Sequence, residues 1–292
     1  MIKISIITPS YNQNQFIEET ILSVINQNYG NIEYIIIDGN STDKSQDTIR
    51  RYENKLAYWI SEPDKGQYDA INKGFSHSTG DIMTWINADD MYTPWAFSIV
   101  SEIFSTFPEI EWITTLYQIH WDKRSRPVKC FQINGGGGYS RKGFYRGENL
   151  PGTGRYSHGW IQQESTFWRR SLWERAGGYL DTSYKLAADF ELWARFFKFT
   201  ELYSIGSPLG GFRVHENQKT AFHYDAYVSE AMDILNKYGG KPHSYFGSLF
   251  RNKFNSHIPS LLKFLAYRLG ILYPQYKCIY SARDGLWEIV QS

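Results

Sequence analysis

Residues 33–43 read EYIIIDGNSTD, an apolar run that ends in an aspartate and continues into a loop of helix-capping residues. The chain repeats this arrangement: further apolar runs occupy 4–8, 56–61 and 81–87, and helical segments cover 17–25, the stretch up to 51, and 68–75. Strands that alternate with helices of this length predict an α/β domain with a parallel sheet and right-handed crossovers. The runs are nearly continuous, which predicts strands covered on both faces.

Polar residues gather where each predicted strand ends. They occupy 8–12, 38–43, 62–65 and 87–90. In open parallel sheets the ligand crevice lies beyond the carboxyl ends of the strands. The sequence therefore predicts a ligand site at this edge of the sheet.

Aspartates are frequent at this edge, and they are Asp38, Asp64, Asp69, Asp89 and Asp90. Carboxylates that lie together repel one another unless a hard cation or a hydrogen-bond donor such as a ribose lies between them. A divalent cation that bridges a diphosphate is the usual reason for such a cluster, although an Asp–Asp pair after a strand is also common in turns. No GxGxxG or GxxxxGK[ST] motif occurs, which argues against a dinucleotide-dependent dehydrogenase and a P-loop kinase.

The composition narrows the possible classes of protein further. The 292 residues carry 31 basic and 30 acidic side chains, and so small a net charge argues against a nucleic-acid-binding protein. Aromatic residues make up 17% of the chain, which fits rings that stack on sugars or flat ligands, a membrane interface, or a bulky core. The two cysteines cannot form a zinc site alone. Neither a signal peptide nor a long apolar run occurs, so we expect a cytoplasmic protein, either soluble or at the inner face of the cell membrane.

The pattern changes after residue 107. Residues 111–121 contain one or two strands, a capping-box spacing at Ser171–Glu174 opens a short helix, and another helix begins near residue 188. The glycine-rich segment 134–155 predicts either a mobile loop near a ligand or an insertion without a role.

The last part of the chain, from about residue 226, is predicted to be helical. Apolar residues of 258–273 share one helical face beside lysine and arginine, so this helix either lies on an anionic membrane or packs on the domain. The predicted division is a domain of residues 1–225, with halves at 1–107 and 108–225, and a helical region at 226–292.

Three segments at the predicted edge resemble family 2 glycosyltransferases of the GT-A fold. They are residues 6–12 (IITPSYN), 36–43 (IIDGNSTD) and 87–90 (NADD). Residues 61–74 (SEPDKGQYDAINKG) are similar to bacterial members that build surface polysaccharides. The resemblance extends to about residue 220. It implies a Rossmann-like, mostly parallel central sheet flanked by helices, with a helical C-terminal extension.

The resemblance also implies an activity: transfer of a sugar from a nucleotide sugar, a UDP-sugar, to a lipid-linked or polysaccharide acceptor. The residues that it assigns to the nucleotide sugar are Thr8, Pro9, Tyr11, Asn12, Asp38, Asp64, Asp69 and Asn87. The residues that it assigns to a Mn²⁺ or Mg²⁺ ion are Asp89, Asp90 and His215. Many relatives have aspartate where this chain has Asn87, so the metal loses one carboxylate here.

Members that resemble this chain invert the anomeric centre, and the matching base is Asp189. A carboxylate in the first turn of a helix is stabilised as the anion, so partly buried surroundings must keep it basic. Many relatives have an acidic residue at the position of Ala188, and here Glu191 or Glu164 supplies that charge. Candidate platforms for the sugar ring are Trp160, Trp168 and Trp193.

Two other functions remain open from the sequence. A non-catalytic nucleotide- or glycan-binding module could use the same scaffold, since Asn87 and Ala188 depart from the family pattern. A nucleotidyltransferase would need a glycine- and lysine-rich loop directly after the first strand, and residues 8–12 are not such a loop.

Overall fold

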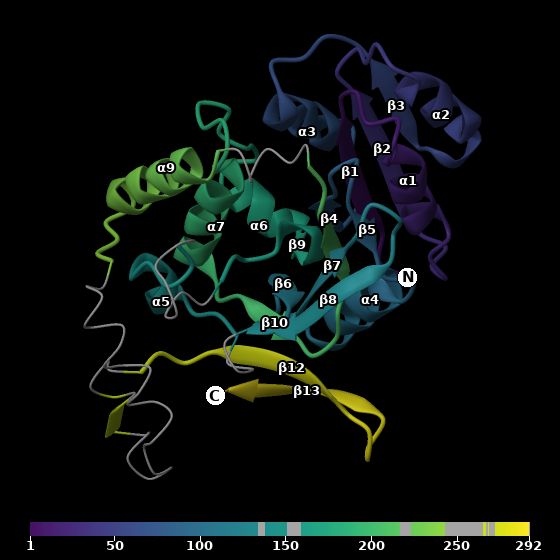
Figure 1. Cartoon of the computed structure of the whole chain (residues 1–292). Coiled ribbons are helices and arrows are strands. Elements are labelled where there is room, and N and C mark those ends of the chain that lie inside the picture. The colour runs from purple at the N-terminus through teal and green to yellow at the C-terminus, as the bar shows by residue number, and fades with distance from the viewer. Residues whose placement is uncertain are drawn as a thin grey trace.

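The computed structural model describes residues 1–133, 138–150, 159–216, 223–242, 265–266, 268 and 272–291 (Figure 1). Most of the helix predicted at 258–273 therefore lies outside the described residues, as does much of the glycine-rich segment. In the described part of the chain, no helix is long and apolar enough to cross a membrane.

A nine-stranded sheet forms the centre of the molecule, in the order β13-β12-β10-β6-β9-β4-β1-β2-β3. Most neighbouring pairs are parallel, and the antiparallel pairs involve β9 and β13. The strands are β1 (Ile4–Ser10), β2 (Ile32–Asp38), β3 (Tyr58–Ser61), β4 (Ile82–Trp85), β6 (Trp112–Thr115), β9 (Phe167–Arg169), β10 (Tyr203–Ile205), β12 (Tyr276–Ser281) and β13 (Leu286–Gln291). The α/β class with a mostly parallel sheet is confirmed.

Helices cover both faces of this sheet (Figure 1). Neighbouring residues of β1 show why: Ile6 belongs to one buried apolar cluster and Ile7 to another, and both are fully buried. The helices are α1 (Ile17–Ile25), α2 (Ser45–Arg51), α3 (Gln67–Ser76), α4 (Ala96–Thr106), α5 (Arg141–Tyr145), α6 (Arg170–Arg175), α7 (Ala188–Phe199) and α9 (Tyr224–Lys237), with 3₁₀ turns η1 (Glu53–Lys55) and η4 (Gln163–Ser165). The prediction of strands covered on both faces is confirmed.

A second sheet, of four strands in the order β5-β11-β7-β8, lies beside the first. Its strands are β5 (Met91–Tyr92), β7 (Tyr117–Trp121), β8 (Pro127–Gln132) and β11 (Gly210–Arg213). A Cβ at Gly210 would lie 2.2 Å from the carbonyl oxygen of Glu164, so only glycine allows this close approach of β11 to η4. The pairing of β11 with β5 brings the residues after Gly210 close to Asp89 and Asp90.

Much of the aromatic content fills the core. Trp85, Trp112, Trp168 and Trp193 are almost completely buried and pack against one another, with ring centroids 5.4–5.9 Å apart in the closest pairs. A sugar ring cannot reach a fully buried indole. The prediction that Trp168 or Trp193 forms a sugar platform is therefore wrong, and of the three candidates only Trp160 is partly exposed.

Three local predictions also need correction. The helical region at 226–292 instead contains a hairpin, because β12 and β13 pair around Gly285 (φ 69°) and extend the central sheet from β10. Within the glycine-rich segment, residues 138–150 include helix α5 and bury Tyr139 and Phe144, so this part belongs to the core. Helix α6 begins at Arg170 without a side-chain cap, so the expected capping box does not form.

Candidate active site

The carboxyl ends of the first strands lie level with one another. Ser10 of β1 is in register with Asp38 of β2, which is in register with Ser61 of β3. The loops that follow these strands, together with the one after β4, therefore form one continuous edge. Of the eight residues predicted to bind the nucleotide sugar, seven lie on the strands and loops of this edge, and Asp69 lies in the first turn of helix α3.

The Asp38 carboxyl organises the loop after β2. Its oxygens accept hydrogen bonds from the Ser41 backbone amide (2.9 Å), the Ser41 hydroxyl (2.6 Å) and the Ser61 hydroxyl (2.6 Å). The side chain is fully buried. A carboxylate offers about four acceptor positions, so three of them hold the loop and one is left.

Tyr11 and Asp64 flank the start of this loop at Gly39. A Cβ at Gly39 would lie 2.6 Å from Asp64 Oδ2 and 3.4 Å from Tyr11 Cδ2. The Tyr11 ring is 60% exposed, so its face is open to a ligand. The buried hydroxyl of the preceding residue, Ser10, has no hydrogen-bond partner in the described chain. An exposed ring, a carboxylate and an unpaired hydroxyl together suit a flat polar group such as a base.

The remaining predicted nucleotide residues have structural partners. The Thr8 hydroxyl lies 3.1 Å from the hydroxyl of Tyr34 inside the sheet, and Pro9 is buried in β1. Asn12 Oδ1 accepts a 2.8 Å bond from the Thr42 amide and so joins the loops after β1 and β2. Asp69 Oδ2 accepts a 3.0 Å bond from the backbone amide of Lys65. These residues shape the edge, and their side chains are engaged within it.

Asn87 links the loop after β4 to helix α3. Its Oδ1 accepts a 2.6 Å bond from Gln67 Nε2, and its Nδ2 donates to Asp90 Oδ2 at 3.1 Å. The amide thus uses both its acceptor and its donor. An aspartate could not donate to Asp90, so asparagine at 87 satisfies the buried carboxyl beside it.

Asp89 is the partly exposed aspartate of the acidic motif, and its side chain contacts His215. His215 Nε2 lies 2.9 Å from Asp89 Oδ2, and the imidazole packs against the ring of Phe16 at 4.7 Å. The Asp89 side chain is 21% exposed and that of His215 only 5%. His215 is therefore not a surface histidine. No three His, Cys, Asp or Glu of the described residues gather into a group that could hold a metal, and Asp89 and His215 could offer two ligands.

Asp90 points the other way, into the protein. Its Oδ1 accepts a 2.8 Å bond from the Arg213 backbone amide, and the side chain is almost completely buried. Burial, the Asp89 charge and the Glu164 charge raise the pKa of Asp90 well above its usual range. The Arg213 side chain donates to the Asp89 backbone carbonyl and pairs with Glu19 (2.7 Å). Asp90 and Arg213 therefore hold the motif in shape, while Asp89 faces outward.

Asp189 lies in the first turn of α7 and is half-buried. Its Oδ1 accepts a 2.8 Å bond from the Phe190 amide, and the Tyr227 hydroxyl donates to the same oxygen at 3.4 Å. Burial outweighs these bonds and raises the pKa of Asp189 to about 6. A carboxylate with a pKa near neutrality is a better proton acceptor than an ordinary aspartate.

The turn before Asp189 is fixed by α9. Glu230 Oε2 accepts from the backbone amides of Leu186 and Ala187, both at 2.9 Å, and Oε1 accepts from that of Lys185 at 3.0 Å. These amides precede a helix and lack intrahelical partners. Helix α9 thus contributes to the site, although its residues after 225 were predicted to lie outside the catalytic domain.

Glu164 lies within interaction range of both halves of the site. The charges of Asp89 and Asp189 each raise its pKa, and burial raises it most, to about 7. Glu191, the other candidate for this charge, instead pairs with Arg195 at 2.8 Å inside the protein. Glu164, and not Glu191, therefore lies within electrostatic range of both Asp89 and Asp189.

Trp160 lies near the same base. Its ring packs on that of Tyr227, with centroids 4.6 Å apart, and it is half-buried. The sequence marked Trp160 only as one of three candidates. The roles of Gln67, Tyr227 and Glu230 were not predictable from the sequence, because they depend on contacts between distant segments. The role of Arg213 was also missed, although this residue lies two positions before His215 in the same motif.

Comparison with known proteins agrees with this fold and edge. The model of glycosyl transferase family 2 matches residues 5–154, just over half of the chain. An uncharacterized glycosyltransferase of Mycobacterium tuberculosis is 30% identical over 189 residues, which are 64% of this chain and 66% of that protein. A putative teichuronic acid biosynthesis glycosyltransferase of Bacillus subtilis, TuaG, is 34% identical over 92 residues, which are 30% of this chain and 36% of TuaG.

Solved structures extend the comparison over nearly the whole chain. S. aureus TarS in complex with UDP-GlcNAc superposes with a TM-score of 0.62 at 14% identity, covering 93% of this chain and 76% of TarS. The mannosyltransferase PcManGT of Pyrobaculum calidifontis, in complex with GDP-Man and Mn²⁺, superposes with a TM-score of 0.55 at 15% identity, covering 92% and 79%.

These likenesses define the class first: the fold is that of the GT-A glycosyltransferases. The match over residues 5–154 then gives the family. The chain belongs to glycosyltransferase family 2, as its motifs predicted.

Proposed function

We propose that the protein transfers a sugar from a nucleotide sugar to a hydroxyl of a lipid-linked or polysaccharide acceptor, with inversion at the anomeric carbon. One observation carries the proposal. Asp89, which pairs with His215, and the basic Asp189 both lie within electrostatic range of the buried Glu164, which supports a diphosphate site and a proton acceptor near one another. Transfer by direct displacement needs both.

The nucleoside would lie at the ends of β1 to β3. The open face of Tyr11 suits a base, and Asp64 beside it accepts a hydrogen bond from a ring N–H or a ribose hydroxyl. We assign Asp38, Asn12 and Thr8 to the support of this pocket, because their polar atoms already bond to its loops or strands. The proposed donor is a UDP-sugar, which TarS also binds.

Asp89 and His215 fit a divalent cation that the diphosphate helps to hold. Magnesium is typically bound by one or two carboxylates together with substrate phosphates, and manganese also accepts imidazole. Two protein ligands are thus enough, and the buried Asp90 is not needed as a third. Such an ion, Mn²⁺ or Mg²⁺, stabilises the charge that develops on the leaving diphosphate. PcManGT was solved with Mn²⁺.

Asp189 would accept the proton of the acceptor hydroxyl. As that oxygen bonds to the anomeric carbon, the bond from this carbon to the diphosphate oxygen breaks, and its electrons leave with the nucleoside diphosphate. Phe190 and Tyr227 hold the Asp189 carboxylate in place, and the Trp160 ring beside Tyr227 offers an apolar face to the sugar or the acceptor. Positioned bases of this kind contribute about 100- to 10,000-fold to rate.

The acceptor and the cellular setting rest on relatives. TuaG is described as acting in teichuronic acid biosynthesis, so we assign this chain to the synthesis of bacterial cell-surface glycans. Such acceptors are built at the inner face of the membrane, where a peripheral contact through residues 258–273 would place the enzyme. We propose a cytoplasmic location on this basis.

A donor screen tests the proposal. The purified protein is incubated with UDP-Glc, UDP-Gal, UDP-GlcNAc, UDP-GalNAc or GDP-mannose, with Mn²⁺ or with EDTA, and released nucleoside diphosphate is measured. We expect release from one donor that EDTA abolishes. No release from any donor, together with no UDP binding in calorimetry, would refute the proposal.

A further inference from the structure

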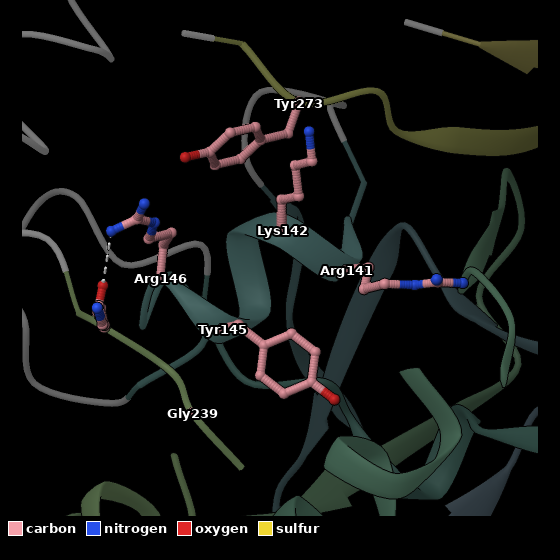
Figure 2. Close-up of a pocket in the computed structure, with 7 residues that line it drawn as sticks. Arg141, Lys142, Tyr145, Arg146, Gly239 and Tyr273 are labelled. Atoms are coloured by element: carbon pink, nitrogen blue, oxygen red, sulfur yellow. Dashed lines mark hydrogen bonds between the residues drawn. The ribbon is translucent and has the colours of Figure 1, made fainter. Parts of the chain in front are cut away.

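A cavity of about 460 Å³ lies away from the nucleotide edge, between α5 and the chain that follows α9. Among the described residues, its lining includes four cations and two tyrosines, and no acidic residue. Figure 2 shows Lys142 of α5 and Arg146, directly after this helix, reaching into the same space as Tyr273, while Arg141 points away from them. A cavity of this volume holds a small organic ligand.

Three of the four cations have no acidic partner among the described residues. Arg141 pairs with Glu201 at 3.1 Å and is thereby neutralised. Among the described residues, Lys142 and Lys241 are exposed and have no partner in an ion pair, and the Arg146 side chain donates to the Lys241 backbone carbonyl at 3.4 Å (Figure 2). Like charges that line one concave surface raise the local concentration of anions. The cavity therefore carries an uncompensated positive charge.

The chemistry of the lining indicates phosphate. Arginine binds phosphate oxygens through paired N–H groups, and lysine binds them as a point charge. Three unpaired cations match a group with several negative charges better than a single carboxylate. The rings of Tyr145 and Tyr273 provide flat walls for the sugar or chain next to such a group.

The cavity is linked to Asp189 by two helices. Helix α5 packs on α7, with Phe144 stacked on Phe190 at 4.5 Å and the Tyr145 hydroxyl bonded to the Ala194 carbonyl at 2.6 Å. The Lys241 amide in turn donates to the Tyr145 carbonyl at 2.8 Å.

Helix α9 gives the distance between the cavity and Asp189. It contacts Asp189 through Tyr227 and reaches the cavity just after Lys237, ten residues further on. At about 1.5 Å per residue, the cavity lies roughly 15 Å from the base along this axis. The residues proposed for the nucleotide lie on the opposite part of the sheet, at β1 to β3 (Figure 1). The donor is thus bound elsewhere, and the acceptor is the substrate that can extend from Asp189 to the cavity.

We propose that this cavity binds phosphate groups of the acceptor, about 15 Å from the hydroxyl that reacts at Asp189. The inference rests on the proposed transferase function and names its acceptor as a phosphate-bearing one. Diphosphate of a lipid-linked sugar and phosphodiester of a polymer share this chemistry.

The test is binding of inorganic pyrophosphate in EDTA buffer, measured by calorimetry. The Lys142→Ala/Arg146→Ala variant is compared with wild type and with Lys55→Ala/Arg124→Ala, which removes one exposed lysine and one exposed arginine outside both sites. We expect at least a tenfold loss of pyrophosphate affinity in the cavity variant only. Equal affinity in all three proteins would overturn the proposal.

Two further arms separate the sources of phosphate and the two proposals. Co-sedimentation with phosphatidylglycerol vesicles, compared with phosphatidylcholine vesicles, measures binding to anionic membrane headgroups. If the cavity variant no longer pellets with phosphatidylglycerol vesicles but keeps its pyrophosphate affinity, the acceptor assignment is overturned in favour of a membrane contact. The wild-type donor screen reports the transferase itself. If the wild-type protein releases no nucleoside diphosphate, a loss of pyrophosphate affinity in the cavity variant still supports a pyrophosphate site at Lys142 and Arg146. The assignment of that site to an acceptor is then refuted.

Discussion

Replacement of Tyr227 by phenylalanine changes the pKa of the proposed base. The Tyr227 hydroxyl donates to Asp189 Oδ1 at 3.4 Å and so lowers the pKa of that carboxyl. Hydrogen bonds to charged groups contribute about 1.5–3 kcal/mol at normal length, and for this long one we take about 0.7 kcal/mol. At 1.36 kcal/mol per unit, the Asp189 pKa of about 6 rises by roughly 0.5.

The assay is the pH dependence of kcat/KM for transfer, which reports the ionisation of the free enzyme. The base must be ionised, so activity falls as the pH drops through the Asp189 pKa, and a raised pKa moves this limb upward. At pH 6 the variant retains about half of the wild-type rate, and at pH 8 the two rates are equal.

A matched control removes a hydroxyl on the same helix pair. The Tyr238 hydroxyl bonds to Glu191 Oε1 and not to Asp189, so Tyr238→Phe leaves the limb in place. If the acidic limb of the pH profile is unchanged in Tyr227→Phe, or shifts to lower pH, the assignment of Asp189 as a base whose pKa depends on Tyr227 is refuted.

Three further changes test other parts of the site. His215→Ala removes a proposed metal ligand and raises the Mn²⁺ concentration for half-maximal release about tenfold or more; an unchanged Mn²⁺ titration contradicts the assignment. Gly39→Ala places a Cβ 2.6 Å from Asp64 Oδ2 and weakens UDP binding about tenfold in calorimetry, with unchanged affinity as the contrary result. Glu191→Ala leaves the buried Arg195 without its acidic partner and lowers the free energy of unfolding by about 3–5 kcal/mol in urea titrations; a loss below about 1 kcal/mol means that the pair is not structural.

The fold of residues 1–107 was predictable because its strands are apolar runs that end in polar residues. Residues 32–38 and 82–85 form strands where the sequence indicated them, and both are covered on two faces. Strand β9 has only three residues, so periodicity cannot reveal it. The hairpin of β12 and β13 escaped prediction because its apolar residues also fit one side of a helix.

The candidate site, like the fold, was predictable only in part. Asp89 and Asp189 could be named from motifs, since their types and positions follow the family pattern. Their surroundings could not. The inward turn of Asp90 depends on the Arg213 amide 123 residues away, and the support of Asp189 depends on Tyr227, 38 residues away. Such contacts exist only once the chain is folded.

The central claim is that one site binds the nucleotide and uses Asp189 to drive transfer. It is tested most directly by measuring UDP binding and nucleoside diphosphate release with Mn²⁺, for wild type and Asp189→Asn. Asparagine can still accept from the Phe190 amide, so the fold of the turn is kept. The account predicts UDP affinity close to that of wild type and a rate about 100- to 10,000-fold lower. A wild-type rate in Asp189→Asn would contradict the base, and binding without release by the wild-type protein would show a non-catalytic module.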